Sequence, residues 1–280
     1  RAERALTMKL ETPSGNLFGY TGARAHQSGQ DAVVFVHGTG MDHTVWVLPS
    51  RYFAHHGYNV LALDLPAHGR SQGKPAPTID AMADAVIQAM ATANISSAAL
   101  VGHSMGSLVA LNAAARYPDC ARSLVLIGST APMGVHPDML RDAADNSHGV
   151  IDMLTYWGYS KAAQLGGNET PGLWMAGNTL RLLERAADDL IHIDLAACKD
   201  YDAGLSHAEA VVCPTLFILG ERDIMTPVRS AQKLINAVAK AQVCVLEGSG
   251  HSLMMERPDA LLDALITIGG KTNCGEATNL

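Results

Sequence analysis

The sequence predicts an α/β fold built on a mostly parallel sheet of eight strands flanked by helices. Short apolar runs recur along the 280 residues, and segments with helical periodicity lie between them. Runs that are apolar at every position suit strands buried on both faces, as in a parallel sheet covered by helices. The alternation of strand and helix is typical of a doubly wound sheet. The runs that predict strands span 7–12, 16–22, 32–38, 59–65, 98–104, 123–129, 214–223 and 242–251, with polar residues at their carboxyl ends.

The first two runs, 7–12 and 16–22, follow each other closely, so we expect an antiparallel pair there. The first expected helix covers 78–94, where apolar residues fall at helical spacing on one stripe. Further helices are predicted after the fifth, seventh and eighth strands, over 106–118, 227–240 and 257–269.

One long segment breaks this alternation. Residues 131–207 contain only helical patterns, and they are too many for a simple connection between two strands. The sequence therefore predicts a core domain formed by 1–130 and 208–280, with a helical lid or cap inserted at 131–207. The tail 271–280 carries no recognisable pattern.

Composition excludes several function classes. Charged residues make up 17% of the chain and the net charge is −7, so we expect no nucleic-acid partner. The five cysteines form no C-x-x-C pair, which argues against a structural metal site. No stretch of 18 apolar residues is present, so we expect no membrane partner. No signal peptide is visible in the sequence, so we expect a cytoplasmic protein. The alternative is a protein whose signal peptide was removed beforehand. The sequence leaves the oligomeric state open.

Ser104 is the candidate nucleophile. It stands in Gly102-His103-Ser104-Met105-Gly106, between an apolar run and a helical pattern. In a nucleophile elbow, flanking glycines let strand and helix pass close together while the serine is held exposed on a strained turn. The alternative is a glycine-rich turn with an incidental serine.

A serine hydroxyl needs a positioned base, and the base needs an orienting carboxylate. His251 follows the last strand in a glycine-flanked loop, and Asp223 follows the strand before it. Glu221 is a weaker candidate for the carboxylate, and Asp64 is interpreted as a turn and cap residue. We expect His103, beside Ser104, to pack or hydrogen-bond locally.

The backbone N–H groups of Thr39 and Met105 are the candidate oxyanion donors. Met105 begins the helix after Ser104, where N–H groups have no partner within the helix. Thr39 lies in the glycine-rich stretch His37-Gly38-Thr39-Gly40 after the third strand, where backbone can approach a carbonyl closely. An ordinary strand-to-loop turn is the alternative for this stretch.

Five motifs occur in order: VHGTG, ALDLPAHGRS, LVGHSMGS, LGERDIMTP and GSGHSLMMERPDAL. Together they resemble the α/β-hydrolase-fold serine hydrolases, of the carboxylesterase kind with a helical lid. The resemblance covers about 30–130 and 208–268, and the lid carries no matching motif. It implies Ser104, Asp223 and His251 as a catalytic triad, acyl transfer through Ser104, and no metal or organic cofactor.

Departures from related families narrow the function. Ser104 replaces the aspartate nucleophile of epoxide hydrolases and dehalogenases, and Ser252 stands where C–C hydrolases usually have tryptophan. We therefore expect a serine esterase acting on small or medium, partly apolar esters. C–C bond hydrolysis, perhydrolysis by the same triad, and a non-catalytic ligand-binding protein remain alternatives. Candidate pocket residues are Gly38, Met153, Trp157, Trp174 and Met175.

Overall fold

The computed structural model describes residues 6–167, 169 and 172–267, so the tail 271–280 lies outside the described residues. Eight strands form one sheet in the order β1-β2-β4-β3-β5-β6-β7-β8, which confirms the predicted fold class. The strands are β1 (Thr7–Thr12), β2 (Gly15–Tyr20), β3 (Ala32–Val36), β4 (Asn59–Asp64), β5 (Ala98–His103), β6 (Ala121–Ile127), β7 (Thr215–Gly220) and β8 (Ala241–Leu246).

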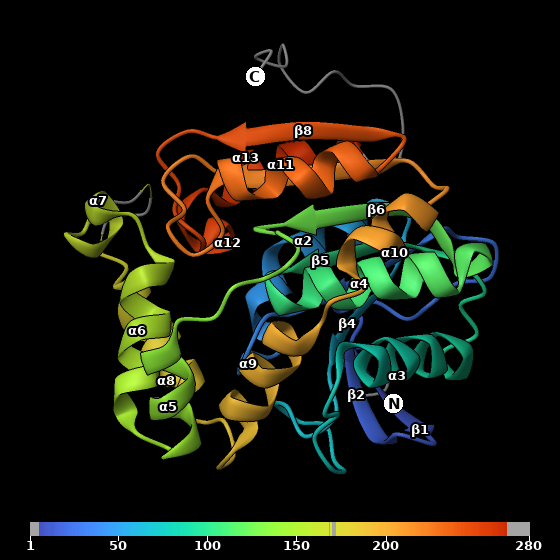
Figure 1. The fold of residues 1–280 in the computed structure, drawn as a ribbon. Helices are drawn as coiled ribbons and strands as arrows, with labels where there is room; N and C mark the ends of the chain where they lie inside the picture. The colour runs from blue at the N-terminus through green and yellow to red at the C-terminus, as the bar shows by residue number, and fades with distance from the viewer. Residues whose placement is uncertain (1–5, 168, 170–171, 268–280) are drawn as a thin grey trace.

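Only β2 runs against the other strands. β1 pairs antiparallel with β2, and β2 pairs antiparallel with β4. All later neighbours are parallel, with Val33 opposite Val60 on one side and Ala99 on the other. The carboxyl ends of six strands therefore meet at one edge of the sheet (Figure 1).

Two of the strands end three or more residues before the apolar runs that predicted them. β7 ends at Gly220, because Glu221 to Asp223 form a turn in which the Asp223 N–H donates to the Gly220 carbonyl. β8 ends at Leu246, so Gly248 to His251 belong to a loop. Both changes place the candidate triad residues in loops beyond the strand ends.

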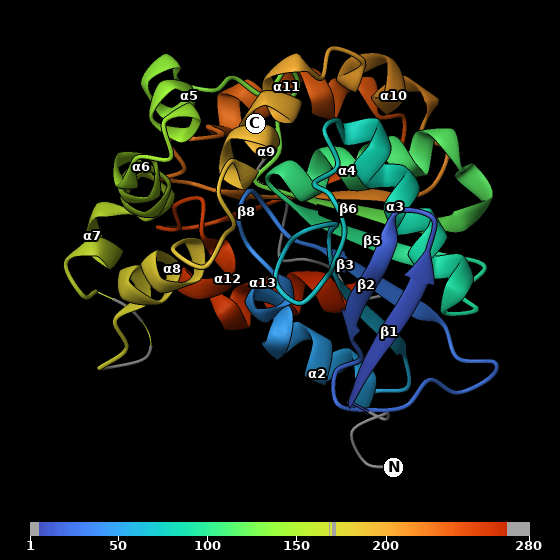
Figure 2. The ribbon, with the colours of Figure 1, turned by 90° about the horizontal axis from the view of Figure 1, so that it is seen from below.

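Alternate residues of the strands enter two different cores. Val34 and Val36 face one cluster, and Val33 and Phe35 face the other. The first is covered by α3 (Ile79–Thr92), α4 (Met105–Arg116), α10 (Gly204–Ala210) and α11 (Val228–Ala237). The second is covered by α2 (Val47–His55), α12 (Leu253–Glu256) and α13 (Pro258–Ile266), on the opposite side of the sheet (Figure 2). Two short 3₁₀ helices, His43–Trp46 and Pro118–Cys120, complete this part.

The segment between β6 and β7 is helical, as its pattern predicted. It holds α5 (Pro137–Ala144), α6 (His148–Gly158), α7 (Lys161–Gln164), α8 (Met175–Leu183), α9 (Leu190–Asp200) and α10. Figure 1 shows α5 to α8 grouped beyond the carboxyl ends of the strands. α5, α6 and α9 share a small core of their own around Met139, Val150 and Leu195.

The predicted boundary at residue 207 falls inside α10. This helix packs against α4 and α11, and its residue Ala208 is fully buried in the core on that face of the sheet. Residues 204–210 therefore lie with the sheet-flanking helices. Every described helix falls short of the length and hydrophobicity that crossing a membrane requires.

Candidate active site

Ser104 stands between β5 and α4 in a strained backbone conformation. Its φ is +53° and its ψ is −122°, values that a residue with a side chain rarely adopts. The Ser104 N–H donates to the Ile127 carbonyl at 2.9 Å, which fixes the turn to the neighbouring strand. The elbow thus holds Ser104 at the carboxyl edge of the sheet and directly before the first turn of a helix.

The glycines on either side of Ser104 are required by close backbone contacts. A Cβ at Gly102 would lie 2.0 Å from the Gly106 carbonyl oxygen, and a Cβ at Gly106 would lie 2.3 Å from the Val36 carbonyl oxygen. Strand β5, helix α4 and the end of β3 therefore meet at distances that only glycine permits. This contact accounts for the G-x-S-x-G spacing that the sequence displays.

His251 and Asp223 form a buried hydrogen-bonded pair. The His251 Nδ1–H donates to Asp223 Oδ2 at 2.7 Å, and each residue is 4% exposed. In the neutral ring, Nε2 then carries the lone pair. This Nε2 is buried and has no hydrogen-bond partner among the described residues, Ser104 included. The ring is thus arranged to accept a proton on the side that faces the cavity.

Asp223 is held as a carboxylate by several donors. Its Oδ1 accepts from the N–H groups of Met225 and Thr226, both at 2.8 Å, and its Oδ2 also accepts from the Thr226 hydroxyl at 2.6 Å. Burial acts to raise the pKa of Asp223, but His251 and Thr226 outweigh it and place that pKa well below its usual value. Sequence analysis missed Thr226. The available signal was an aspartate at the start of a loop, because an Asp side chain there tends to bind the N–H two residues on, which is that of Met225.

The other histidine beside the elbow has a local role. His103 is fully buried, and its Nε2–H donates to the His251 carbonyl at 2.9 Å. Burial lowers the pKa of His103 to about 3, so it stays neutral beneath the His251 ring, whose centroid lies 4.8 Å away. The expectation that His103 packs and bonds locally agrees with this placement.

The alternative carboxylates are engaged elsewhere. Glu221 is exposed, and its Oε2 accepts from the Gly248 N–H at 2.9 Å. Asp64 is fully buried, and its Oδ1 accepts from the N–H and the ring Nδ1 of His43. Neither carboxylate contacts His251.

Asp42, His43 and Asp64 are the residues of the described chain whose ligand atoms come together as a metal site would need, within 4.8 Å of one another. Asp42 also accepts from the Thr44 N–H at 2.9 Å as the cap of the short helix His43–Trp46. Hydrogen bonds from His43 and Thr44 therefore already occupy these carboxylates.

The two candidate oxyanion donors come from segments next to Ser104. Met105 is the first residue of α4, and Thr39 follows Gly38, whose Cβ position would lie 3.3 Å from the Ser104 Cβ. Within the described chain, neither the Thr39 nor the Met105 N–H donates to another group. Both N–H groups are therefore free to donate to an oxygen of a ligand.

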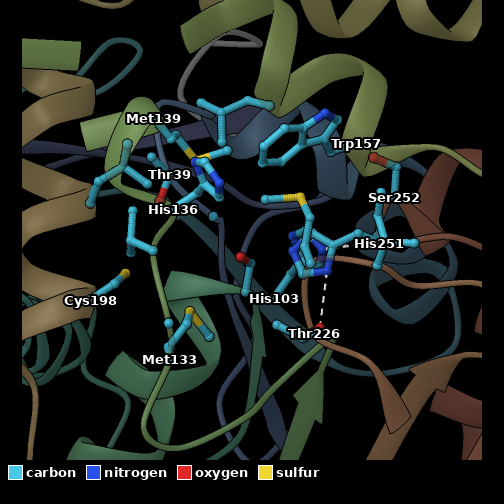
Figure 3. Close-up of a pocket in the computed structure, with 18 of the residues that line it drawn as sticks. Thr39, His103, Met133, His136, Met139, Trp157, Cys198, Thr226, His251 and Ser252 are labelled. Carbon is cyan, nitrogen blue, oxygen red and sulfur yellow. Dashed lines mark hydrogen bonds between the residues drawn. The ribbon is translucent and has the colours of Figure 1, made fainter. Parts of the chain in front are cut away.

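A cavity of about 380 Å³ opens above Ser104. In Figure 3, Thr39 and Cys198 lie across this cavity from His251 and Ser252. Its lining is mostly apolar, and none of its residues is Lys, Arg, Asp or Glu. The lining comprises Gly38, Thr39, Met41, His103, Ser104, Met133, Gly134, Val135, His136, Met139, Leu154, Trp157, Leu183, Leu195, Cys198, Ile224, Met225, Thr226, His251 and Ser252.

Of the five candidate pocket residues, Gly38 and Trp157 line this cavity. The structure places the other three elsewhere. Met153 packs in the small core shared by α5, α6 and α9, and Met175 is buried against Tyr159 and Ala176. Trp174 is 65% exposed. Periodicity and residue type could not separate these fates, because which face of each helix meets the cavity depends on how the helices pack together.

Comparison with known proteins agrees with this geometry. The chain is 25% identical over 247 residues to (E)-2-((N-methylformamido)methylene)succinate hydrolase of Acinetobacter baylyi, covering 84% of this chain and 89% of that protein. The enol-lactonase of Burkholderia xenovorans LB400 superposes with a TM-score of 0.84 at 20% identity, covering 93% of this chain and 99% of that one. An esterase from Exiguobacterium antarcticum gives 0.79 at 18% identity, covering 92% and 97%.

The family model is matched over most of the chain. Residues 33–264 match the model described as "Alpha/beta hydrolase family". These residues extend from β3 to α13 and so include the elbow, both loops of the candidate triad and the helical segment. With its eight-stranded sheet and this match, the protein belongs to the alpha/beta hydrolase family.

Proposed function

We propose that the protein is a serine hydrolase that cleaves uncharged, partly apolar carboxylic esters of small to medium size. The observation that carries this proposal is the shared cavity of Ser104 and His251, in which the unpartnered His251 Nε2 is backed by the Asp223 carboxylate. A hydroxyl, a base and an orienting carboxylate at one site are the groups that acyl transfer needs.

In the proposed mechanism, the Ser104 oxygen attacks the ester carbonyl while its proton passes to His251 Nε2. The carbonyl oxygen becomes an oxyanion, which accepts hydrogen bonds from the N–H groups of Thr39 and Met105. The C–O bond to the alcohol breaks, and the imidazolium gives its proton to the leaving oxygen. Water then attacks the acyl-enzyme with His251 again as base, and releases the acid and Ser104. The low pKa of Asp223 keeps it ionised throughout, so that it stabilises the imidazolium.

The cavity supports an uncharged substrate. Its lining offers no Lys or Arg side chain. Apart from His103 and the candidate base His251, the lining residue that can carry a positive charge is the half-exposed His136. A substrate carboxylate would lose its hydration without gaining an ion pair, which is costly. The relative from Acinetobacter baylyi is named for a succinate, which carries two carboxylates. We therefore propose that this chain acts on a different substrate from that relative.

A test combines covalent labelling with turnover. A fluorophosphonate probe is expected to label one residue, and Ser104→Ala is expected to abolish the labelling. Turnover of p-nitrophenyl butyrate should fall at least about 10³-fold in that variant. Ser206→Ala, at an exposed serine of α10, is the matched control and should leave both unchanged. Undiminished turnover in Ser104→Ala would refute the proposal.

The charge preference has its own measurement. The p-nitrophenyl monoester of succinic acid has a length similar to the butyrate ester but ends in a carboxylate. We expect its kcat/KM to be at least about tenfold lower, since an unpaired charge entering the apolar cavity costs more than about 1.4 kcal/mol. Equal kcat/KM for the two esters would contradict the proposed preference while leaving the serine mechanism intact.

A further inference from the structure

Asp194 is a carboxylate of α9 that reaches the loop after β3. It is fully buried, and its Oδ2 accepts from the Gly40 N–H at 2.9 Å and from His68 Nε2 at 2.9 Å. Its Oδ1 has no partner among the described residues. Burying a carboxylate is costly unless it is paired. The two bonds of Asp194 supply that pairing and connect three segments, which are α9, the loop after β3 and the loop after β4.

His68 balances the charge of Asp194. Its Nδ1 lies 3.0 Å from the Pro66 carbonyl and its Nε2 lies 2.9 Å from the Asp194 carboxylate. Both groups are acceptors, so both ring nitrogens must donate and the ring is an imidazolium. Burial acts to lower the pKa of His68, but Asp194 outweighs it and the pKa is raised. The pair is therefore a buried salt bridge between α9 and the loop after β4.

The Gly40 amide that Asp194 binds belongs to the same peptide unit as the Thr39 carbonyl, so this bond restrains the Thr39 backbone. Cys198, one helical turn after Asp194 on α9, lines the same cavity as Thr39. Gly40 has a φ of +64°, and a Cβ there would lie 3.0 Å from both Leu183 and Ile191. Helix α9 thus restrains the loop directly after Thr39, because Asp194 binds the Gly40 N–H and Ile191 leaves no room for a side chain at residue 40.

We propose that Asp194 is a positioning residue for the oxyanion hole, which fixes the Thr39 N–H by holding the next amide of the loop. The inference rests on the proposed function, in which the Thr39 N–H binds the oxyanion. The proposal gives α9, which belongs to the segment between β6 and β7, a role in positioning a group that binds the oxyanion. Asp194 itself touches neither Ser104 nor His251, so it acts through Thr39.

The kinetic test compares Asp194→Ala with the wild type on p-nitrophenyl butyrate. Loss of one oxyanion donor typically costs about 10²- to 10³-fold in kcat, so a misplaced donor is expected to lower kcat by about 10- to 100-fold. KM should change less than about threefold, because the Thr39 amide acts mainly in the transition state. The affinity for a trifluoromethyl ketone, which forms an oxyanion on Ser104, should fall in parallel with kcat.

Two further variants separate positioning from folding. Asp194→Asn keeps an oxygen that can accept from the Gly40 N–H and should recover most of kcat. The double variant Asp194→Ala with His68→Ala removes both charges, so no ion is left unpaired, and it should show the same kcat loss as Asp194→Ala. Asp200→Ala, at the exposed end of α9, is the matched control and should behave as wild type. A kcat and a ketone affinity within twofold of wild type in Asp194→Ala and the double variant would overturn the proposal.

Hydrogen exchange gives a readout that does not depend on turnover. In Asp194→Ala or the double variant, the Gly40 amide should exchange at least tenfold faster than in wild type. Faster exchange in a protein that shows neither labelling nor turnover would refute the proposed function and leave the anchoring role standing. Unchanged exchange would refute the anchoring role, whatever the activity.

Discussion

Gly128 controls the position of the candidate base without having a functional group of its own. It follows the last residue of β6, and its φ is +55°. A Cβ there would lie 2.9 Å from Cε1 and 3.0 Å from Nδ1 of His251. The ring therefore occupies space that any side chain at residue 128 would take. Within the run SLVLIGS, this glycine gave no signal of its own, because the contact joins residues far apart in the sequence.

Gly128→Ala should move the His251 ring away from its bonded position. We expect kcat for an ester substrate to fall at least tenfold, and the free energy of unfolding to fall by about 1–3 kcal/mol from backbone strain. Gly29→Ala is the matched control, since Gly29 has a φ of +82° but no atom within 4 Å of its Cβ position. It should show the strain cost without the kcat loss. Equal kcat values for the two variants would contradict the steric role of Gly128.

At the scale of elements, one carboxylate ties the His251 loop to the helical segment. Glu256 of α12 accepts from the Gly250 N–H at 2.8 Å and from the Ser160 N–H at 3.2 Å, and it is 5% exposed. The Ser252 N–H donates to the Gly158 carbonyl at 2.8 Å. The loop that carries His251 and the end of α6 are therefore joined by buried hydrogen bonds on both sides of His251.

Glu256→Ala leaves the Gly250 and Ser160 N–H groups buried without a partner. We expect the free energy of unfolding to fall by about 1.5–3 kcal/mol, as measured by urea denaturation, because bonds to a charged acceptor are lost. Glu247→Ala, at an exposed glutamate of the same loop region, should change it by less than about 0.5 kcal/mol. A loss in Glu256→Ala no larger than in this control would show that the tie contributes nothing to stability.

For the whole molecule, buried neutral histidines set the response to acid. Burial lowers the pKa of His37 and of His103 to about 3, whereas an unfolded imidazole titrates near 6.5. Between these values the unfolded chain binds more protons than the folded one, so the free energy of unfolding falls as pH falls. Glu256 acts in the opposite direction, because burial raises its pKa. His68, whose pKa is raised, is protonated in both states below 6.5 and adds no slope there.

Urea denaturation at pH 6.0 and pH 5.0 tests this balance. Each histidine contributes at most about 1.4 kcal/mol per pH unit, so we expect the wild type to lose roughly 1–3 kcal/mol between the two values. His103→Gln should reduce that loss by up to about 1.4 kcal/mol, since one titrating ring is removed. His136→Gln, at a half-exposed histidine, serves as control. An identical slope in His103→Gln and wild type would rule out His103 as a source of the acid sensitivity.

The sequence by itself determined the sheet, because strands buried on both faces must be apolar at every position, whatever their partners. It also determined Ser104, Asp223 and His251 as candidates, since each follows a strand whose carboxyl end must lie at the same edge. Tertiary structure decided the rest. Contacts between distant segments decide the space that Gly128 leaves for the His251 ring. They also decide that Trp157, and not Trp174, lines the cavity. Local patterns do not encode such contacts, because they record which face of a helix is apolar and not what that face will meet.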